Sequence, residues 1–331
     1  MIKICNLNKS MLSCFDNPYS LDYLKQHGIV FSNNLFRSHV ILSTSSQTLR
    51  FNLVKKVFPF KKFITWTTEP RHDERQAGII DENTIAMNVF TGDVFFHNLH
   101  FLGTYHNIYD LDLGINFLFP PQTPLTIEKL QAKKKFCIAV FAYRDPAKIK
   151  LYLNGKNIDL FEKRQQLTHF FYRHNRTDIA GNNWPEQFTV KEKSGYENQY
   201  EKWWIRKLDL LQDYKFNICF ENTIHPYYCT EKIWHAITAG CLPIYWGKGT
   251  LIYETFPEQS FIDASLFESN EALLHYIENL LPEEHITRYN KCLETMHKAC
   301  AFRASDTAYK TDVLDKLILK VYSLTNRNSA N

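Results

Sequence analysis

Thr230, Glu231 and Lys232 are three consecutive residues whose side chains could bind a nucleotide. Thr230 can cap the N-terminus of a helix, where free backbone N–H groups and the helix dipole together favour an anion. Lys232 then stands in the first helical turn, where its ammonium can hold a phosphate, and Glu231 can accept two hydrogen bonds from a ribose diol. The same residues also have a simpler interpretation, as an N-cap with a dipole-favoured acid and a solvated surface lysine.

The elements around these residues are predicted to form one βαβ unit. An apolar strand is expected over 216–220, a helix over 230–239 and a second strand over 242–246, and Gly240 can end the helix. In such a unit, the loop after the first strand and the N-terminus of the helix form a ready anion site. The sequence therefore predicts that an anion binds where the first strand ends.

Residues 214–247 resemble the donor-binding motif of the α-1,3/1,4-fucosyltransferases, glycosyltransferase family 10. The motif elements stand in order and without gaps, as Tyr214-Lys215-Phe216, Phe220-Glu221-Asn222, Tyr228-Cys229-Thr230-Glu231-Lys232 and Pro243 to Gly247. The resemblance implies a GT-B fold, in which two Rossmann-like domains face a central cleft. It implies that the second domain binds GDP-fucose, with Glu231 at the ribose and Lys232 at a phosphate. Asn222 and Tyr228 belong to the same implied donor site.

Arg164 is the candidate for a further contact with the diphosphate. In the family an arginine with this role lies in a helix upstream of an Asp-x-x-Gly turn, and 178–181 matches that turn. Arg164 shares a helical stripe with Leu160, Leu167 and Phe171, where an unpaired guanidinium would be costly, so it needs an anionic partner. Phosphate suits the planar guanidinium, and an internal salt bridge to an acid is the alternative.

Arg144 is a rival for the same phosphate. The Ser-Asn pair that usually ends the preceding strand of the family is replaced here by Tyr143-Arg144-Asp145-Pro146, and an extra segment, about 147–157, follows. The sequence alone does not decide between the two arginines.

Glu69 is the candidate general base. It follows an expected strand in Thr67-Thr68-Glu69-Pro70, where the family has a Glu followed shortly by Pro at the end of a first-domain strand. A carboxylate there would take the proton of the acceptor hydroxyl, which contributes ~10²–10⁴-fold to the rate. Without the family, a glutamate before proline is usually a solvated turn residue. The other acids nearest in sequence are Asp73, Glu74 and Asp81, and the aromatic groups expected to line the acceptor are Trp66, His72, Tyr105 and His106.

Composition excludes several other classes of protein. The chain has 331 residues, 44% hydrophobic and 22% charged, which are ordinary globular values and exclude disordered and collagen-like chains. The net charge of +4 comes from interleaved basic and acidic residues, so a nucleic acid is not an expected partner. None of the eight cysteines forms a CxxC pair, and Cys137, Cys219 and Cys241 are predicted to be buried thiols.

The sequence pattern indicates an α/β protein of two domains. Three prolines within 120–124 favour a stiff connector, so we expect an acceptor-binding Rossmann-like domain over 1–124, a linker over 125–134 and a GDP-sugar-binding Rossmann-like domain with C-terminal helices over 135–331. Strands are expected over 39–43, 62–66 and 136–142, and helices over about 158–173 and 198–212. The last helices are expected to cover the second sheet or to cross back to the first domain.

The combined interpretation is an inverting, metal-independent fucosyltransferase. It would move L-fucose from GDP-β-L-fucose to a sugar hydroxyl, O3 of GlcNAc or Glc, of an oligosaccharide, glycolipid, lipopolysaccharide or protein glycan. No cofactor is expected, since cationic side chains can take the place of a divalent ion at the diphosphate, and stimulation by a divalent metal is left open. The N-terminal segment has no long apolar region and no stretch approaches ~18 apolar residues, which favours a cytoplasmic protein with or without peripheral contact to the inner membrane. The alternatives are a transferase for another GDP-sugar and a catalytically silent nucleotide- or glycan-binding protein.

Overall fold

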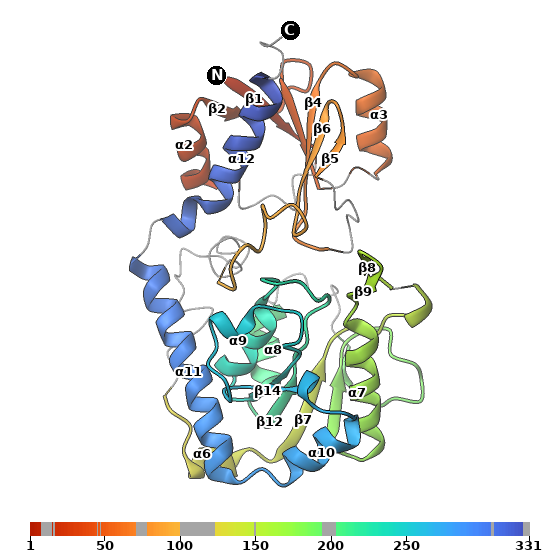
Figure 1. The fold of residues 1–331 in the computed structure, drawn as a ribbon, viewed down its shortest axis with the longest axis vertical. Helices are drawn as coiled ribbons and strands as arrows, with labels where there is room; N and C mark the ends of the chain where they lie inside the picture. The colour runs from red at the N-terminus through yellow and green to blue at the C-terminus, as the bar shows by residue number, and fades with distance from the viewer. Residues whose placement is uncertain are drawn as a thin grey trace. The chain divides into compact units, whose positions relative to one another are not determined.

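The chain folds into two α/β units (Figure 1). Unit 1 comprises Met1–Gly114 and Arg303–Asn331, and unit 2 comprises Ile115–Phe302. The computed structural model describes residues 1–7, 15, 17–44, 46, 48–70, 78–99, 123–148, 150–193, 203–305 and 308–326. The predicted α/β class with two Rossmann-like domains is confirmed.

Unit 1 is built on a mainly parallel sheet with the strand order β2-β1-β3-β4-β6-β5. The strands are β1 (Ile2–Asn6), β2 (Ile29–Phe31), β3 (Val40–Ser43), β4 (Lys62–Trp66), β5 (Ile79–Asp81) and β6 (Thr84–Met87). Only the pairing of β5 with β6 is antiparallel among the described pairs of this sheet. The strands expected over 39–43 and 62–66 are confirmed as β3 and β4, which are buried on both faces as parallel strands usually are.

The helices described in unit 1 are α2 (Pro18–Gln26), α3 (Leu49–Val57) and α12 (Ala308–Asn326). Helix α2 begins where the Asn17 side chain accepts the Ser20 N–H at 2.9 Å and where Pro18 occupies the first helical position. Thr48 caps α3 in the same way, through the Phe51 N–H at 3.1 Å. Capping residues therefore set the start of both helices.

Helix α12 belongs to unit 1, so the predicted domain 135–331 is wrong at its C-terminal end. Its buried residues include Val313, Leu314, Leu317 and Val321, and it packs against α2 and β4. The Tyr23 hydroxyl donates to Asp315 at 2.7 Å, and the Tyr322 hydroxyl donates to the His27 carbonyl at 2.8 Å. The apolar face of α12 is buried in unit 1, which is the alternative that the sequence had left open.

Unit 2 is built on an all-parallel sheet with the order β11-β10-β7-β12-β13-β14. The strands are β7 (Lys135–Val140), β10 (Thr177–Ala180), β11 (Val190–Glu192), β12 (Tyr214–Ile218), β13 (Leu242–Tyr245) and β14 (Ile262–Asp263). Counted along the chain within this sheet, the order is third, second, first, fourth, fifth and sixth, which is the doubly wound arrangement. The strand order reverses between the neighbouring parallel strands β7 and β12, and doubly wound folds bind ligands beside the carboxyl ends of the strands at such a switch point. The region at the carboxyl ends of β7 and β12 is called the crevice below.

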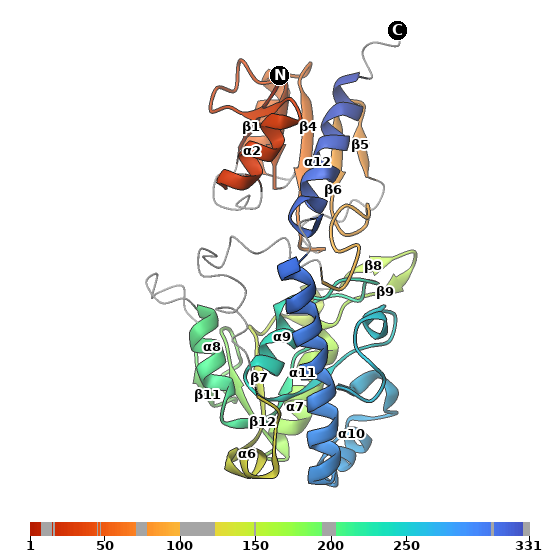
Figure 2. The same cartoon turned by 90° about the vertical axis from the view of Figure 1, so that its left-hand side faces the viewer.

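The helices of unit 2 cover both faces of this sheet. They are α6 (Ile127–Ala132), α7 (Phe161–Arg173), α8 (Trp203–Leu211), α9 (Glu231–Thr238), α10 (Asn270–Glu278) and α11 (Pro282–Ser305). Helix α8 packs with α9 and α7 packs with α10, and Figure 1 shows these pairs on opposite sides of the sheet. Figure 2 shows α11 running along the same unit. None of the helices that the structure describes combines the length and apolar character needed to cross a membrane.

The predicted linker and the extra segment near 147–157 both form regular structure in unit 2. The predicted linker 125–134 contains α6, and its Leu125 N–H donates to the Asn290 side chain at 2.8 Å, so this segment is part of unit 2. The extra segment near 147–157 forms an antiparallel hairpin of β8 (Tyr152–Leu153) and β9 (Lys156–Asn157). Of the three prolines that suggested a connector, Pro120 and Pro121 lie outside the described residues, and Pro124 directly precedes Leu125.

Candidate functional site

Helix α9 places the Thr230-Glu231-Lys232 tripeptide at the crevice. The helix starts at Glu231, and the chain reaches it from β12 through a loop. Thr230 occupies the N-cap position as predicted, but its side chain makes no capping hydrogen bond. At the other end Gly240 has φ +75°, its N–H donates to Ile237 and the Cys241 N–H donates to Ala236, both at 2.9 Å. This is a Schellman ending, so glycine stops α9 where the sequence predicted.

Glu221 is a buried carboxylate that holds the start of α9. Its side chain is 2% exposed, and it accepts the Thr230 N–H at 2.8 Å and the Thr230 hydroxyl at 2.6 Å. The Lys232 ammonium donates to it at 3.0 Å, and the Tyr245 hydroxyl lies 3.5 Å away. Burial raises the pKa of Glu221, and the Lys232 ammonium works against that rise. We did not predict a role for Glu221, although its position directly after an apolar strand could have indicated one.

Lys232 is not a solvated surface charge, because its side chain is only 16% exposed. Besides Glu221 it donates to the Thr230 hydroxyl at 2.6 Å, and its Nζ lies 3.7 Å from Glu231. The simpler interpretation of the tripeptide is therefore wrong for Lys232.

Glu231 lies between two lysines. Its carboxylate is 3.7 Å from the ammonium of Lys232 and 3.9 Å from that of Lys207, whose side chain is 9% exposed. Burial alone would raise the pKa of Glu231, but the two lysines outweigh it and hold the pKa at about 2. Glu231 is therefore an anion, ready to accept hydrogen bonds from hydroxyl groups. Lys207 was not predicted, because it lies on α8, which the sequence motif does not include.

Arg164 lies on the buried face of α7, as its helical stripe predicted, and is 2% exposed. Its Nη1 donates to the Phe220 carbonyl at 2.7 Å and its Nη2 to the Asn222 side chain at 3.4 Å. The guanidinium carbon is 4.1 Å from the centre of the Phe141 ring. Because Phe141 follows β7 and Phe220 and Asn222 follow β12, Arg164 is fixed at the crevice by neutral groups from both strand ends.

The other predicted donor residues are also placed in unit 2. Asn222 is joined to Arg164 by its side chain and accepts the Leu160 N–H at 3.2 Å through its carbonyl. Tyr228 is buried in the loop before α9. Arg144 is an exposed residue, and its N–H and carbonyl are bonded to the Gln165 side chain at 2.7 and 2.9 Å.

Contacts with neighbouring strands explain both the aspartate and the glycine of the Asp-x-x-Gly turn. Asp178 accepts the Tyr214 hydroxyl at 2.6 Å, which ties β10 to β12 across β7. Gly181 has φ +123°, and a Cβ there would lie 2.2 Å from the Phe141 carbonyl oxygen. Only glycine fits, so the turn brings β10 close to the crevice residue Phe141.

Glu69 lies in unit 1, after the carboxyl end of β4, and is half-buried. Its N–H donates to the Thr67 hydroxyl at 3.2 Å, and the Thr67 N–H donates to Met87 at 3.1 Å, which anchors the turn to β6. The strand-end position is as predicted. Of the rival acids, Asp81 is ion-paired with Lys55, and Asp73 and Glu74 lie outside the described residues.

Of the four aromatic residues expected to line the acceptor, the structure describes Trp66, and this residue does not have that role. Trp66 is 4% exposed and packs edge-on against Phe15 with ring centres 5.0 Å apart, so it belongs to the core of unit 1 and does not line an acceptor. His72, Tyr105 and His106 lie outside the described residues.

The cysteines and acids of the described residues show no metal centre. Among these residues, no three His, Cys, Asp or Glu side chains are grouped as metal ligands. Cys137, Cys219 and Cys241 are buried free thiols, as predicted, and burial raises the pKa of Cys137 to about 12. They are packing residues with little thiolate character.

The chain is similar to proteins that transfer fucose. Residues 146–300 match a family model described as glycosyltransferase family 10 (fucosyltransferase) C-term. The human 4-galactosyl-N-acetylglucosaminide 3-alpha-L-fucosyltransferase is 39% identical over 75 residues, which are 22% of this chain and 21% of that protein. A Bos taurus 3-galactosyl-N-acetylglucosaminide 4-alpha-L-fucosyltransferase is 41% identical over 69 residues, 20% of this chain and 19% of that protein. The chain thus spans about a fifth of the length of these curated relatives.

The chain also matches solved structures of glycosyltransferases at low sequence identity. An alpha1,3-fucosyltransferase matches 93% of this chain and 91% of its own with a TM-score of 0.48 and 15% identity. The same kind of enzyme with GDP-fucose gives a TM-score of 0.42 at 18% identity, covering 89% of this chain and 81% of that one. The T4 phage beta-glucosyltransferase gives a TM-score of 0.48 at 8% identity, covering 95% and 98%.

Proposed function

We propose that the chain is an inverting fucosyltransferase that uses GDP-β-L-fucose as its donor, because residues 146–300 match the model of glycosyltransferase family 10. The acceptor we propose is a glycan hydroxyl, O3 of a GlcNAc or Glc residue. The relatives' names, which specify galactosylated N-acetylglucosamine, support this acceptor class.

The observation that carries the proposal is the grouping of cationic and N–H donors at the switch point of the unit 2 sheet. Arg164 reaches the ends of β7 and β12, and Lys232 is fixed at the start of α9 by the buried Glu221. An anion bound there would meet a guanidinium, an ammonium and the N–H groups of a helix N-terminus. A diphosphate has the charge and the number of acceptor oxygens for this set.

The same groups would stabilise the leaving nucleotide. As the bond between fucose C1 and the phosphate oxygen breaks, negative charge grows on GDP, and preorganised cationic donors stabilise that charge more than the ground state. The Lys232 ammonium already lies beside the carboxylates of Glu221 and Glu231, so a bound phosphate would compete with them for its N–H donors. Glu231, held as an anion, would accept hydrogen bonds from the ribose.

Glu69 would activate the acceptor. Its carboxylate would take the proton of the acceptor hydroxyl while that oxygen forms a bond to C1 on the face opposite the departing GDP, which inverts the configuration. This role requires hydrogen-bond reach to the acceptor hydroxyl, about 2.6–3.2 Å. The position of Glu69 after the carboxyl end of β4 supports it, because open α/β sheets present ligand-binding groups at that edge.

The test is transfer of radiolabelled fucose from GDP-fucose to N-acetyllactosamine and lactose, with GDP-mannose as the competing donor. We expect labelled fucose in the acceptor, with the α-linkage detected by NMR. Transfer from GDP-mannose and not from GDP-fucose would contradict the proposed donor. Tight GDP binding without transfer from either donor would contradict the proposed activity and point to a binding protein.

A further inference from the structure

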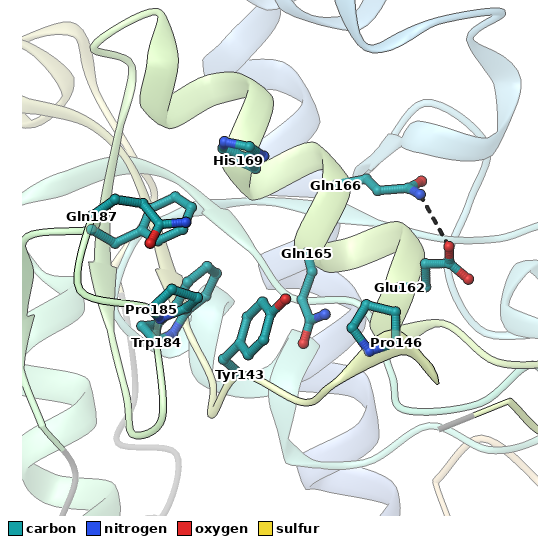
Figure 3. Close-up of a pocket in the computed structure, with 10 residues that line it drawn as sticks. Tyr143, Pro146, Glu162, Gln165, Gln166, His169, Trp184, Pro185 and Gln187 are labelled. Atoms are coloured by element: carbon teal, nitrogen blue, oxygen red, sulfur yellow. Dashed lines mark hydrogen bonds between the residues drawn. The ribbon is translucent and has the colours of Figure 1, made fainter. Parts of the chain in front are cut away.

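A pocket of about 170 Å³ lies in unit 2 between α7 and the loop that follows β10 (Figure 3). The residues considered above for the donor do not line it. One wall is aromatic and is formed by Tyr143, Trp184 and Phe188, and the opposite wall is polar and comes mainly from α7. This pocket is therefore separate from the candidate donor site.

The aromatic wall is fixed in place. The Trp184 ring centre lies 5.4 Å from that of Tyr143 and 5.2 Å from that of Phe188. The indole N–H donates to the Phe141 carbonyl at 2.9 Å, which sets the orientation of the ring. Trp184 and Tyr143 are each half-buried, so part of their surface remains open to the pocket. A ligand ring packed there would find the aromatic surface already ordered.

The polar wall can exchange hydrogen bonds with a neutral ligand. Glu162 and Gln166 stand one turn apart on α7, joined by a 3.3 Å hydrogen bond, and Gln187 comes from the loop (Figure 3). Amides both donate and accept, and a carboxylate accepts, which matches hydroxyl groups that do both. None of the lining residues that the structure describes is a lysine or an arginine. His169 also lines the pocket, and burial lowers its pKa, which favours the neutral imidazole, so the lining does not suit a phosphate.

The pocket is connected to the crevice through Phe141 and Gln165. Phe141 contacts the Arg164 guanidinium and also lies 5.3 Å from Trp184, ring centre to ring centre. Gln165 lines the pocket and holds the backbone of Arg144 through two hydrogen bonds. A ligand in the pocket would therefore lie next to residues that fix the candidate phosphate contacts.

We propose that this pocket binds a neutral sugar ring of the acceptor glycan, away from the hydroxyl that receives fucose. The aromatic wall suits the apolar C–H face of a sugar, and the amides and the carboxylate suit its hydroxyl groups. The proposal rests on the proposed function, since it takes the glycan to be the acceptor.

The first test is binding without the donor. N-acetyllactosamine, lactose and the tetrasaccharide lacto-N-neotetraose are titrated into the protein and followed by saturation-transfer NMR. The double variant Gln166→Ala/Gln187→Ala removes two exposed amides, and we expect its dissociation constant to rise ~10-fold, the loss of two neutral hydrogen bonds. Gln212→Ala, an exposed glutamine of unit 2 that does not line the pocket, is the matched control and should bind as the wild type does.

Three results would overturn the proposal: no binding of any of the three sugars, equal affinity in the double variant and the wild type, or displacement of the sugar by guanosine. Because this binding needs no fucose transfer, the pocket and the proposed function can fail separately. In transfer assays the double variant should raise the KM for lacto-N-neotetraose ~10-fold and leave the KM for GDP-fucose unchanged. An unchanged acceptor KM in an active enzyme would also contradict the sugar pocket.

Discussion

Glu221 connects the chemistry of the candidate site to the stability of unit 2. It is buried, and it accepts hydrogen bonds from the Thr230 backbone, the Thr230 hydroxyl and Lys232. Such a carboxylate is stabilising only while its partners are in place, because removing one side of a buried pair leaves the other side uncompensated. Its hydrogen bonds hold Thr230 at the start of α9 and the Lys232 ammonium beside it, which is the work of a positioning residue.

The first prediction concerns Glu221→Gln. The amide keeps the size of the side chain but not its charge, so Lys232 loses an ion pair, and the free energy of unfolding should fall by about 1–3 kcal/mol. Affinity for GDP should fall as well, because Lys232 is no longer held in position. Urea denaturation and calorimetry measure the two effects. Glu258→Gln, at an exposed position, is the control, and equal behaviour of the two variants would show that Glu221 holds nothing in place.

The second prediction concerns pH and Glu231. Its pKa of about 2 lies below the ordinary value of 4.5, so the folded state binds a proton less readily than the unfolded state. The stability that Glu231 contributes is therefore complete above pH 4.5 and is lost as the pH falls toward 2. The free energy of unfolding should decline more steeply over this range in the wild type than in Glu231→Gln. If the free energy of unfolding changed with pH in the same way in the two proteins, the lowered pKa of Glu231 would be contradicted.

The third prediction separates Arg164 from Arg144. If Arg164 holds the diphosphate, Arg164→Lys keeps the charge but loses the planar fork, and kcat should fall more than the donor KM rises. Arg144→Ala, at an exposed site, should leave kcat close to the wild-type value. Steady-state kinetics on proteins with matching circular dichroism spectra provide the measurement. The reverse pattern would assign the diphosphate to Arg144.

At the scale of elements, the β10 turn determines how closely the strands of unit 2 approach the crevice. The fourth prediction is that Gly181→Ala destabilises the protein by about 3 kcal/mol or more, because the new Cβ would meet the Phe141 carbonyl at 2.2 Å. Gly155→Ala is the matched control, since Gly155 also has a positive φ, +76°, but has open space around it. The control should cost only about 1–2 kcal/mol, the price of the left-handed backbone. An equal fall in the melting temperature of Gly181→Ala and Gly155→Ala would show that the clash with the Phe141 carbonyl does not destabilise the protein.

The elements around the motif could be predicted well, and their contacts could not. The apolar run before Glu221 and the glycine at 240 define β12 and α9 to within a residue or two. The stripe of Leu160 and Leu167 placed Arg164 on the buried face of α7. Lys207 was missed because it reaches Glu231 from α8, which is distant in sequence from the motif. Trp66 was misplaced because an aromatic residue at a strand end suits either a core or a surface, and only the packing against Phe15 decides.

At the scale of the whole molecule, the sequence predicted two α/β domains but not which one holds the C-terminal helix. The apolar face of α12 could cover any sheet, and its partners in unit 1, such as Tyr23 and His27, lie almost the whole chain length away. The predicted linker failed for a related reason, since Leu125, just before α6, is held by Asn290 on α11. Long-range contacts of this kind leave no local sequence pattern.

In the proposed function, residues of unit 2 bind the donor and Glu69 of unit 1 accepts the proton. Replacement of that one carboxylate should therefore separate binding from chemistry. Affinity for GDP should stay at the wild-type level in Glu69→Gln, since the candidate phosphate contacts are unchanged. The amide of this variant can hydrogen-bond but cannot take a proton at neutral pH.

The most direct measurement is the rate of fucose transfer by Glu69→Gln, relative to the wild type, as a function of pH. We expect a loss of ~10²-fold or more in rate and the disappearance of the acidic limb of the pH profile, because no titrating base remains at that position. Transfer at a near-normal rate, or an unchanged acidic limb, would contradict the assignment of Glu69 as the base.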